Sequence, residues 1–272
     1  MSPRAARLLF TACLIGALSC ASARTLVVCA DPNNLPFSNR ARQGFENRIA
    51  EIVARDLGAS IDYVWWAQRR GYVRNTVNAE KCDLWAGVAT GVDMLATTAP
   101  YYRSSYVFVT RADRPLGGLT LDDERLRHLS IGVQMVGNDA TNTPPAHALA
   151  RRGITQNVRG FMLYGDYEKP NPPSAIVDAV ARGNLDVALV WGPLAGYFSE
   201  KTSAKLRLEP ITPTLDGGHW PMTFGIGMGL RKDAPELKNE IEAVMEREKP
   251  AIDATLRKYG VPLTQATLAS VP

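Results

Sequence analysis

The chain has 272 residues, of which 46% are hydrophobic and 21% are charged, and its formal net charge is +4. This composition is normal for a globular protein with a packed core, and nothing in it suggests binding to nucleic acid. A chain of this length could form one large domain or two smaller ones.

The first 23 residues have the pattern of a cleaved signal peptide. Arg4 and Arg7 precede an apolar run from Leu8 to Leu18 that is too short to span a bilayer, and Ala21-Ser22-Ala23 supplies an A-x-A cleavage signal. A lipoprotein with an acylated Cys20 is the weaker alternative. No later segment has the apolar length of a membrane helix, so we expect a protein that is exported to the periplasm.

Two cysteines remain after cleavage, Cys29 and Cys82. In an oxidising compartment we expect them to form a disulfide that closes a loop of about 50 residues. The alternative is that each is a small buried residue. Without nearby histidines the pair makes a poor metal site, and we expect no metal and no cofactor.

The elements expected first in the mature chain alternate between strands and helices. Thr25 to Ala30 is an apolar strand, Phe45 to Leu57 has helical spacing with Gly58 as its C-terminal cap, and Ile61 to Trp65 is a second strand. A short helix over Tyr72 to Val77 and a strand over Asp83 to Val88 follow. This alternation predicts a parallel sheet covered by helices.

The pattern starts again after a glycine-rich and charged stretch, over residues 114–127. We expect strands over Leu129 to Gln134 and Leu185 to Trp191, and helices over Ala146 to Arg152 and from an N-cap at Ser174 to Arg182. Phe224 to Leu230 then reads as a strand that returns to the first lobe. A final helical region begins at Asp233 with Glu236 completing a capping box, bends at Pro250 and ends at Gly260.

The stretch 83–111 carries the first family resemblance. A strand ends in Thr90-Gly91-Val92-Asp93 and is followed by Pro100-Tyr101-Tyr102 and a second strand, Tyr106 to Thr110. This resembles the first-lobe exit of family 3 periplasmic solute-binding proteins. The resemblance implies an α/β, two-lobed periplasmic binding protein-like type II fold with two crossovers and a central cleft. Lobe 1 would be 24–112 and 218–272, and lobe 2 would be 113–217.

Two positions depart from the amino-acid-binding members that the chain resembles. Those members place an arginine where Asp93 stands, to pair with the ligand carboxylate, and an aspartate where Trp191 stands, to hold the ammonium group. The sequence therefore predicts a cleft without the amino-acid clamp.

Ligands of open α/β lobes gather at the carboxyl ends of strands, which predicts the residues of the cleft. We expect it to be lined by aromatic, amide and polar side chains. They are Asp31, Asn33, Asn34, Phe37, Trp65, Trp66, Arg69, Thr90, Asp93, Tyr101, Tyr102, Gln134, Asn138, Asp139, Trp191, His219 and Trp220.

Three of these residues could also carry chemistry. Asp31 and Asp139 are candidates for an acid and a base, although a loop aspartate is more often a turn cap. His219 lies near the second crossover and is more often a hinge hydrogen-bonder than a metal ligand. Trp65 and Trp66 are neighbours on one strand and cannot both point inward, so at least one faces the cleft or a partner.

A closer resemblance comes from four strings: CADPNNLPFSN, GFENRIAEIVARDLG, VWWAQRRGYVRNT and TTAPYYRSSYVFVTR. They are similar to the quinoprotein dehydrogenase-associated solute-binding proteins of the MoxJ and XoxJ type. The resemblance implies a non-enzymatic accessory protein that assists the maturation or activation of a pyrroloquinoline-quinone (PQQ)-dependent methanol or alcohol dehydrogenase. The dehydrogenase or its subunit would be the partner, with a peptide or small molecule in the cleft.

Two other functions stay open from the sequence. One is a substrate-binding protein of an ABC transporter that takes an uncharged or aromatic small molecule. The other is an enzyme on the same scaffold, for which Asp31, Asp139 and His219 come from separate segments with no shared spacing.

Overall fold

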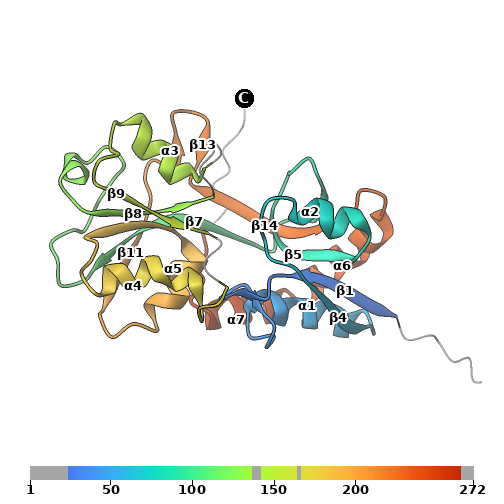
Figure 1. Ribbon diagram of the computed structural model, residues 1–272. Helices are drawn as coiled ribbons and strands as arrows, with labels where there is room; N and C mark the ends of the chain where they lie inside the picture. The colour runs from blue at the N-terminus through green and yellow to red at the C-terminus, as the bar shows by residue number, and fades with distance from the viewer. Residues whose placement is uncertain (1–23, 137–141, 164–166, 265–272) are drawn as a thin grey trace, which may run out of the picture.

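The computed structural model describes residues 24–136, 142–163 and 167–264. The predicted signal peptide, Asn138 and Asp139 lie outside these residues. The chain folds into two α/β lobes side by side, joined by the long strands β7 and β14 (Figure 1). This arrangement confirms the predicted two-lobed periplasmic binding protein fold.

The sheet of lobe 1 has the strand order β4-β1-β5-β14-β7. Its strands are β1 (Thr25–Ala30), β4 (Ser60–Trp65), β5 (Leu84–Ala89), β14 (Thr223–Leu230) and the first part of β7 (Tyr102–Arg111), with β6 (Ala96–Thr97) beside β14. β1 runs parallel to both β4 and β5, as the alternation of strands and helices predicts. β14 and β7 are antiparallel to their neighbours, because each crosses between the lobes.

Helices cover both faces of this sheet. On one face, α1 (Phe45–Asp56), α6 (Pro235–Arg247) and α7 (Lys249–Lys258) pack over the alternate β1 residues Leu26 and Val28. On the other, α2 (Tyr72–Asn75) and η1 (Val77–Ala79) cover Cys29. Successive side chains of a strand point to opposite faces, so one apolar strand supplies both cores.

The sheet of lobe 2 has the strand order β9-β8-β10-β7-β11. As with β4-β1-β5 in lobe 1, the earliest of its three parallel strands, β8, lies between the other two. Its strands are β8 (Ile131–Met135), β9 (Val158–Met162), β10 (Val187–Trp191), β11 (Leu206–Pro210) and the second part of β7. The helices α4 (Ala175–Ala181) and α5 (Gly192–Ser199), with η3 (Pro172–Ser174), pack on one face; α3 (Pro144–Arg151) and η2 (Glu124–Arg127) pack on the other.

The two lobes share β7. Its residues Tyr102–Ser105 pair with β14, whereas Tyr106–Arg111 pair with β10 and β11. Two short ribbons, β2 (Asn33–Asn34) with β3 (Ser38–Asn39) and β12 (Leu215–Asp216) with β13 (Trp220–Pro221), complete the fold. The lobe boundaries at 112/113 and 217/218 stay predictions, and Met222, beyond the second boundary, packs in the core of lobe 2.

One predicted helix cap is not made, and one predicted helix start is wrong. α4 begins directly after Ser174, as predicted, but Ser174 has helical backbone angles and its hydroxyl donates to the Asp178 carboxylate instead of capping the helix. The last helical region begins at Pro235 after Ala234, so Asp233 and Glu236 form no capping box. Gly58, in contrast, has φ +63 directly after the C-cap of α1, as its predicted role requires.

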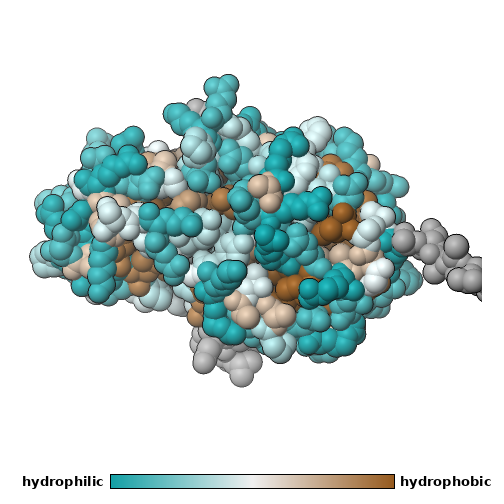
Figure 2. Space-filling view, turned by 90° about the horizontal axis from the view of Figure 1, so that it is seen from below, coloured by the Kyte–Doolittle hydropathy of each residue, from teal (hydrophilic) through white to brown (hydrophobic). Residues whose placement is uncertain are grey.

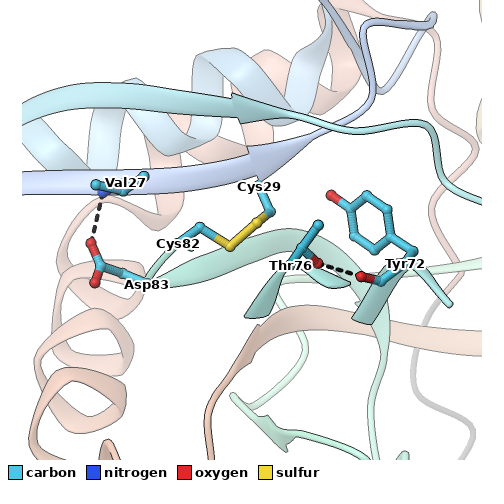
Figure 3. Close-up of a disulfide and its surroundings, with 6 residues drawn as sticks. All are labelled: Val27, Cys29, Tyr72, Thr76, Cys82 and Asp83. Atoms are coloured by element: carbon cyan, nitrogen blue, oxygen red, sulfur yellow. Dashed lines mark hydrogen bonds between the residues drawn. A yellow bond between two sulfur atoms is a disulfide. The ribbon is translucent and has the colours of Figure 1, made fainter. Parts of the chain in front are cut away.

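A disulfide joins Cys29 of β1 to Cys82, which lies just before β5, and confirms that prediction (Figure 3). The two Cα atoms are 5.6 Å apart. Two hydrogen bonds flank it: Val27 N–H donates to the Asp83 carboxylate at 2.7 Å, and the Thr76 hydroxyl donates to the Tyr72 carbonyl at 2.6 Å. The bridge therefore fixes the η1–β5 connection against the first strand.

Among the described residues, none of the helices is long and apolar enough to cross a membrane. The face of the molecule in Figure 2 is mostly hydrophilic, and its hydrophobic residues form small separate patches.

Candidate functional site

A cavity of about 790 Å³ lies between the lobes, at the carboxyl ends of the lobe 1 strands. Residues of both lobes line it. Those of lobe 1 include Asn34, Phe37, Glu46, Gln68, Arg69, Arg70, Tyr72, Arg74, Trp85, Gly87, Val88, Ala89, Val92, Leu95, Tyr102, Phe224 and Ile226; those of lobe 2 and the crossover are Tyr106, Gln134, Leu163, Trp191 and Leu194.

Aromatic rings form the wall where the two lobes meet. The ring centroids of Tyr106 and Trp191 are 5.2 Å apart, and Phe224 lies 6.0 Å from Trp191 and 6.4 Å from Tyr106, all in edge-to-face contact. These rings come from β7, β10 and β14. The wall therefore belongs to the strands that join the lobes, and it presents apolar surface to the cavity.

Gln134 holds one part of this wall in place. Its side-chain oxygen accepts the backbone N–H of Trp191 at 2.8 Å, and its backbone carbonyl accepts the Thr143 hydroxyl at 2.6 Å. Gln134 is buried and lines the cavity, so it links β8 to the end of β10 from inside the site.

Asp31 is fully buried beside the cavity and is saturated with donors. Its carboxylate accepts the backbone N–H groups of Asn33 at 2.8 Å and Gln68 at 2.7 Å, and the Tyr167 hydroxyl at 2.5 Å. The first bond is an Asx turn, which is the cap role that the sequence favoured over acid–base chemistry.

The two asparagines after Asp31 also bond across the loops. The Asn33 side chain donates to the carbonyls of Lys169 at 3.0 Å and Tyr167 at 3.4 Å, which belong to lobe 2. The Asn34 side chain donates to the Gln68 side-chain oxygen at 2.9 Å. Only Asn34 of the two lines the cavity.

Six of the predicted site residues line the cavity: Asn34, Phe37, Arg69, Tyr102, Gln134 and Trp191. Asn138 and Asp139 lie outside the described residues. The others lie elsewhere.

Trp65 and Trp66 are both outside the lining. Trp65 stacks on Tyr63 with 4.8 Å between ring centroids, and Trp66 is 41% exposed with Lys81 Nζ 4.8 Å above its ring. Trp66 is therefore the exposed member of the pair, and its contact with a partner stays a prediction.

Asp93, Thr90 and Tyr101 occupy the first-lobe exit without lining the cavity. Asp93 is exposed, and Thr90 is half-buried against β14 with its N–H donated to the Gly225 carbonyl. Tyr101 is buried and its hydroxyl donates to the Ala86 carbonyl at 2.8 Å.

His219 and Trp220 lie on the β12–β13 ribbon of lobe 2. His219 is exposed, and Trp220 stacks on His147 of α3 with ring centroids 4.2 Å apart. Within the described ranges, no group of three or more His, Cys, Asp or Glu residues is placed to bind a metal ion.

Glu46 is one of the polar cavity residues that the sequence did not predict; Gln68, Arg70 and Arg74 are the others. It belongs to the first turn of α1, is only 6% exposed, and lines the cavity. Burial, and to a lesser degree repulsion by the Asp31 carboxylate, raise the pKa of Glu46 to about 8. At neutral pH the carboxyl of Glu46 is therefore mostly protonated.

The sequence is similar to MoxJ proteins over nearly its whole length. It is 35% identical over 253 residues to protein MoxJ of Methylorubrum extorquens AM1, an alignment that covers 89% of this chain and 82% of that protein. The chain belongs to the MoxJ family. No protein-family model matches it.

Two solved structures share this fold at appreciable identity. The periplasmic binding protein XoxJ from Methylobacterium extorquens AM1 is 34% identical with a TM-score of 0.72, covering 88% of this chain and 99% of that one. MxaJ from Methlophaga aminisulfidivorans MPT is 26% identical with a TM-score of 0.73, covering 88% and 100%.

Proposed function

We propose that this protein is a periplasmic accessory protein of a PQQ-dependent methanol or alcohol dehydrogenase. In this proposal residues 1–23 are a signal peptide that is removed on export, and the mature protein assists maturation or activation of the dehydrogenase without catalysing a reaction. Membership of the MoxJ family and the likeness to XoxJ, a periplasmic binding protein, support it.

The observation that carries the proposal is the aromatic lining of the cavity in a fold otherwise suited to small zwitterions. The positions of the amino-acid clamp hold Asp93, which is exposed outside the lining, and Trp191, which forms part of the aromatic wall. Losing both charged partners of a ligand costs enough affinity to abolish amino-acid binding. Such a cavity suits an apolar segment of a protein partner.

A small-molecule receptor is the second candidate, and the cavity volume favours it. About 790 Å³ lies within the range of ordinary ligand sites, and aromatic walls with a few polar groups are typical of them. An enzyme is less well supported, since Asp31 is saturated by hydrogen bonds and His219 is exposed on lobe 2.

The test is genetic complementation with a filled cavity. A strain that lacks this gene receives the wild type, Ala89→Trp or Ala79→Trp, and periplasmic PQQ-dependent alcohol dehydrogenase activity is measured. Ala89 lines the cavity, whereas Ala79 is exposed at the end of η1 and serves as the matched control. We expect activity to be lost in the deletion strain, restored by wild type and Ala79→Trp, and reduced at least severalfold with Ala89→Trp.

A thermal melt of both purified variants shows whether Ala89→Trp still folds. Full dehydrogenase activity in the deletion strain, together with calorimetric binding of a small solute by the purified protein, would overturn the accessory role and favour the receptor.

A further inference from the structure

Glu46 is an acidic group buried without a counter-ion. The described part of the chain offers its carboxyl neither a hydrogen-bond donor nor a basic partner, and the nearby charge that acts on it is the carboxylate of Asp31. The other titratable groups that face it are phenols: Tyr72 of α2, and Tyr101 and Tyr102 at the start of β7. A buried carboxyl of this kind costs stability unless something pairs with it.

The fold makes space for this carboxyl at one position of β5. A Cβ atom on Gly87 would overlap Glu46 Oε1, so the carboxyl fills the place of the missing side chain. β5 bulges at this point, because its register with β14 shifts between Gly227 and Gly229, and Trp85 packs beside α2, on the opposite face of the sheet from α1. The carboxyl of Glu46 therefore approaches β5 from the α1 side, and it lines the same cavity as Tyr72 and Trp85.

Two further polar atoms that border the same cavity lack partners among the described residues. Tyr72 and Trp85 pack against each other with ring centroids 5.0 Å apart, and both line the cavity. The Tyr72 hydroxyl and the Trp85 indole N–H are buried, and neither has a hydrogen-bond partner of good geometry among the described residues. Gln68 approaches the hydroxyl and slightly offsets the effect of burial, which raises the pKa of Tyr72.

These three groups together specify a ligand. An acidic group without a counter-ion beside aromatic faces suits a cation, and the Trp85 indole can only donate, so it needs an oxygen. A basic residue on a peptide supplies both, with its side chain as the cation and a backbone carbonyl as the acceptor. Three exposed arginines also line the cavity, Arg69, Arg70 and Arg74, and none of them pairs with the buried carboxyl.

We infer that Glu46, Tyr72 and Trp85 form a subsite for an arginine or lysine side chain of a peptide segment, with a neighbouring peptide carbonyl bound by the Trp85 indole. The inference deepens the proposed function, because it names the chemistry of the partner segment that enters the cavity. It also assigns recognition of the partner segment to three residues of lobe 1, and not to Asp93 or Trp191 at the positions of the amino-acid clamp.

Cation binding at this subsite has a characteristic pH dependence. The raised pKa of Glu46 means that the carboxyl must release its proton to pair with a cation. Affinity for a cationic peptide should therefore rise about tenfold per pH unit on approaching pH 8 and level off above it. A neutral peptide gains nothing from this ionisation.

The experiment uses calorimetric titration of the purified full mature chain with capped tripeptides. The probe is acetyl-Leu-Arg-Leu-amide, and its matched control carries citrulline, which has the shape of arginine without the charge. We expect the arginine peptide to bind at least roughly 30-fold more tightly at pH 8, as for other buried charge pairs. Glu46→Gln should abolish both this preference and its pH dependence, while leaving citrulline-peptide binding and the melting profile near wild type.

Three results would overturn the inference. They are equal binding of the arginine and citrulline peptides, a preference that survives in Glu46→Gln, and no binding of the arginine peptide at millimolar concentration. Agmatine, which has the guanidinium but no carbonyl, should bind at least tenfold more weakly than the peptide; equal binding would reassign the subsite to a free amine. If dehydrogenase activity in the complementation test still falls with Ala89→Trp in any of these cases, the proposed function stands.

Discussion

Glu46 shows how one side chain can couple the stability of a protein to its binding site. The folded chain holds the Glu46 proton until about pH 8, whereas an unfolded glutamate releases it near pH 4.5. Between these values the folded protein binds more protons than the unfolded chain, so raising the pH favours unfolding. Without a cavity ligand the protein is therefore less stable at pH 8 than at pH 5. A ligand that pairs with the carboxylate should restore the lost stability.

This coupling predicts the behaviour of Glu46→Gln. The variant should match the wild type at pH 4.5 and become more stable by up to about 5 kcal/mol at pH 8, from 1.36 kcal/mol per unit of pKa shift. Urea unfolding at pH 5, 6.5 and 8 measures the difference. Glu240→Gln, at a half-exposed ion pair with Arg24, is the control and should show little pH dependence. A stability difference between Glu46→Gln and wild type that is constant with pH would contradict the assignment.

The sequence could not identify Glu46 because its position in the chain is that of an ordinary first-turn glutamate. What makes it unusual is the missing Cβ of Gly87 and the nearness of Asp31, and both come from other segments. Asn34, Phe37, Tyr102, Gln134 and Trp191 were predictable, since they follow strand ends or flank the crossover. Polar residues at strand ends carry a topological signal, whereas a buried acid on a helix does not.

At the level of elements, long apolar strands and strongly amphipathic helices could be predicted and short polar ones could not. β1 and α1 have unbroken periodicity and were located within a residue or two. β9 and β11 are edge strands, the first mostly exposed and the second mostly half-buried, so their sequences lack an apolar run. α5 begins with Gly192-Pro193, which reads as a turn, although proline at the first positions of a helix is favourable.

The disulfide ties together two elements that carry the cavity wall. Cys82 lies between η1 and β5, so the bond to Cys29 limits how far Tyr72 and Trp85 can move from β1. This arrangement predicts that the bridge supports both stability and the shape of the cavity.

Replacing both cysteines tests this role. Cys29→Ala/Cys82→Ala should lower the free energy of unfolding by about 4 kcal/mol, because the bridge closes a loop of 53 residues that is otherwise free in the unfolded chain. Urea unfolding under oxidising conditions measures the loss. Wild type reduced with dithiothreitol should lose a similar amount, and equal stability of the oxidised wild type and the variant would show that the bridge contributes nothing.

At the level of the whole molecule, the lobes are held together by contacts on both sides of β7 and β14. The Tyr167 hydroxyl of lobe 2 bonds the Asp31 carboxylate of lobe 1, and Asn33 donates to the Lys169 carbonyl. On another side, Gly196 of α5 lies so close to the Gly260 carbonyl that a Cβ atom there would overlap it. The order of strands predicted two lobes, but no sequence pattern indicates contacts between loops that lie far apart in the chain.

Removing the loop contacts should open the cavity. In Asn33→Ala/Tyr167→Phe the lobes lose one charge-assisted hydrogen bond and two neutral ones, which together favour the closed arrangement by at least about 2 kcal/mol. We expect a larger radius of gyration by small-angle X-ray scattering, and a return toward the wild-type value when a cavity ligand is added. Asn78→Ala, at an exposed position of η1, is the control and should leave the scattering unchanged. If the double variant scatters like the wild type, the lobe angle is set instead by β7, β14 and the contact between Gly196 and Gly260.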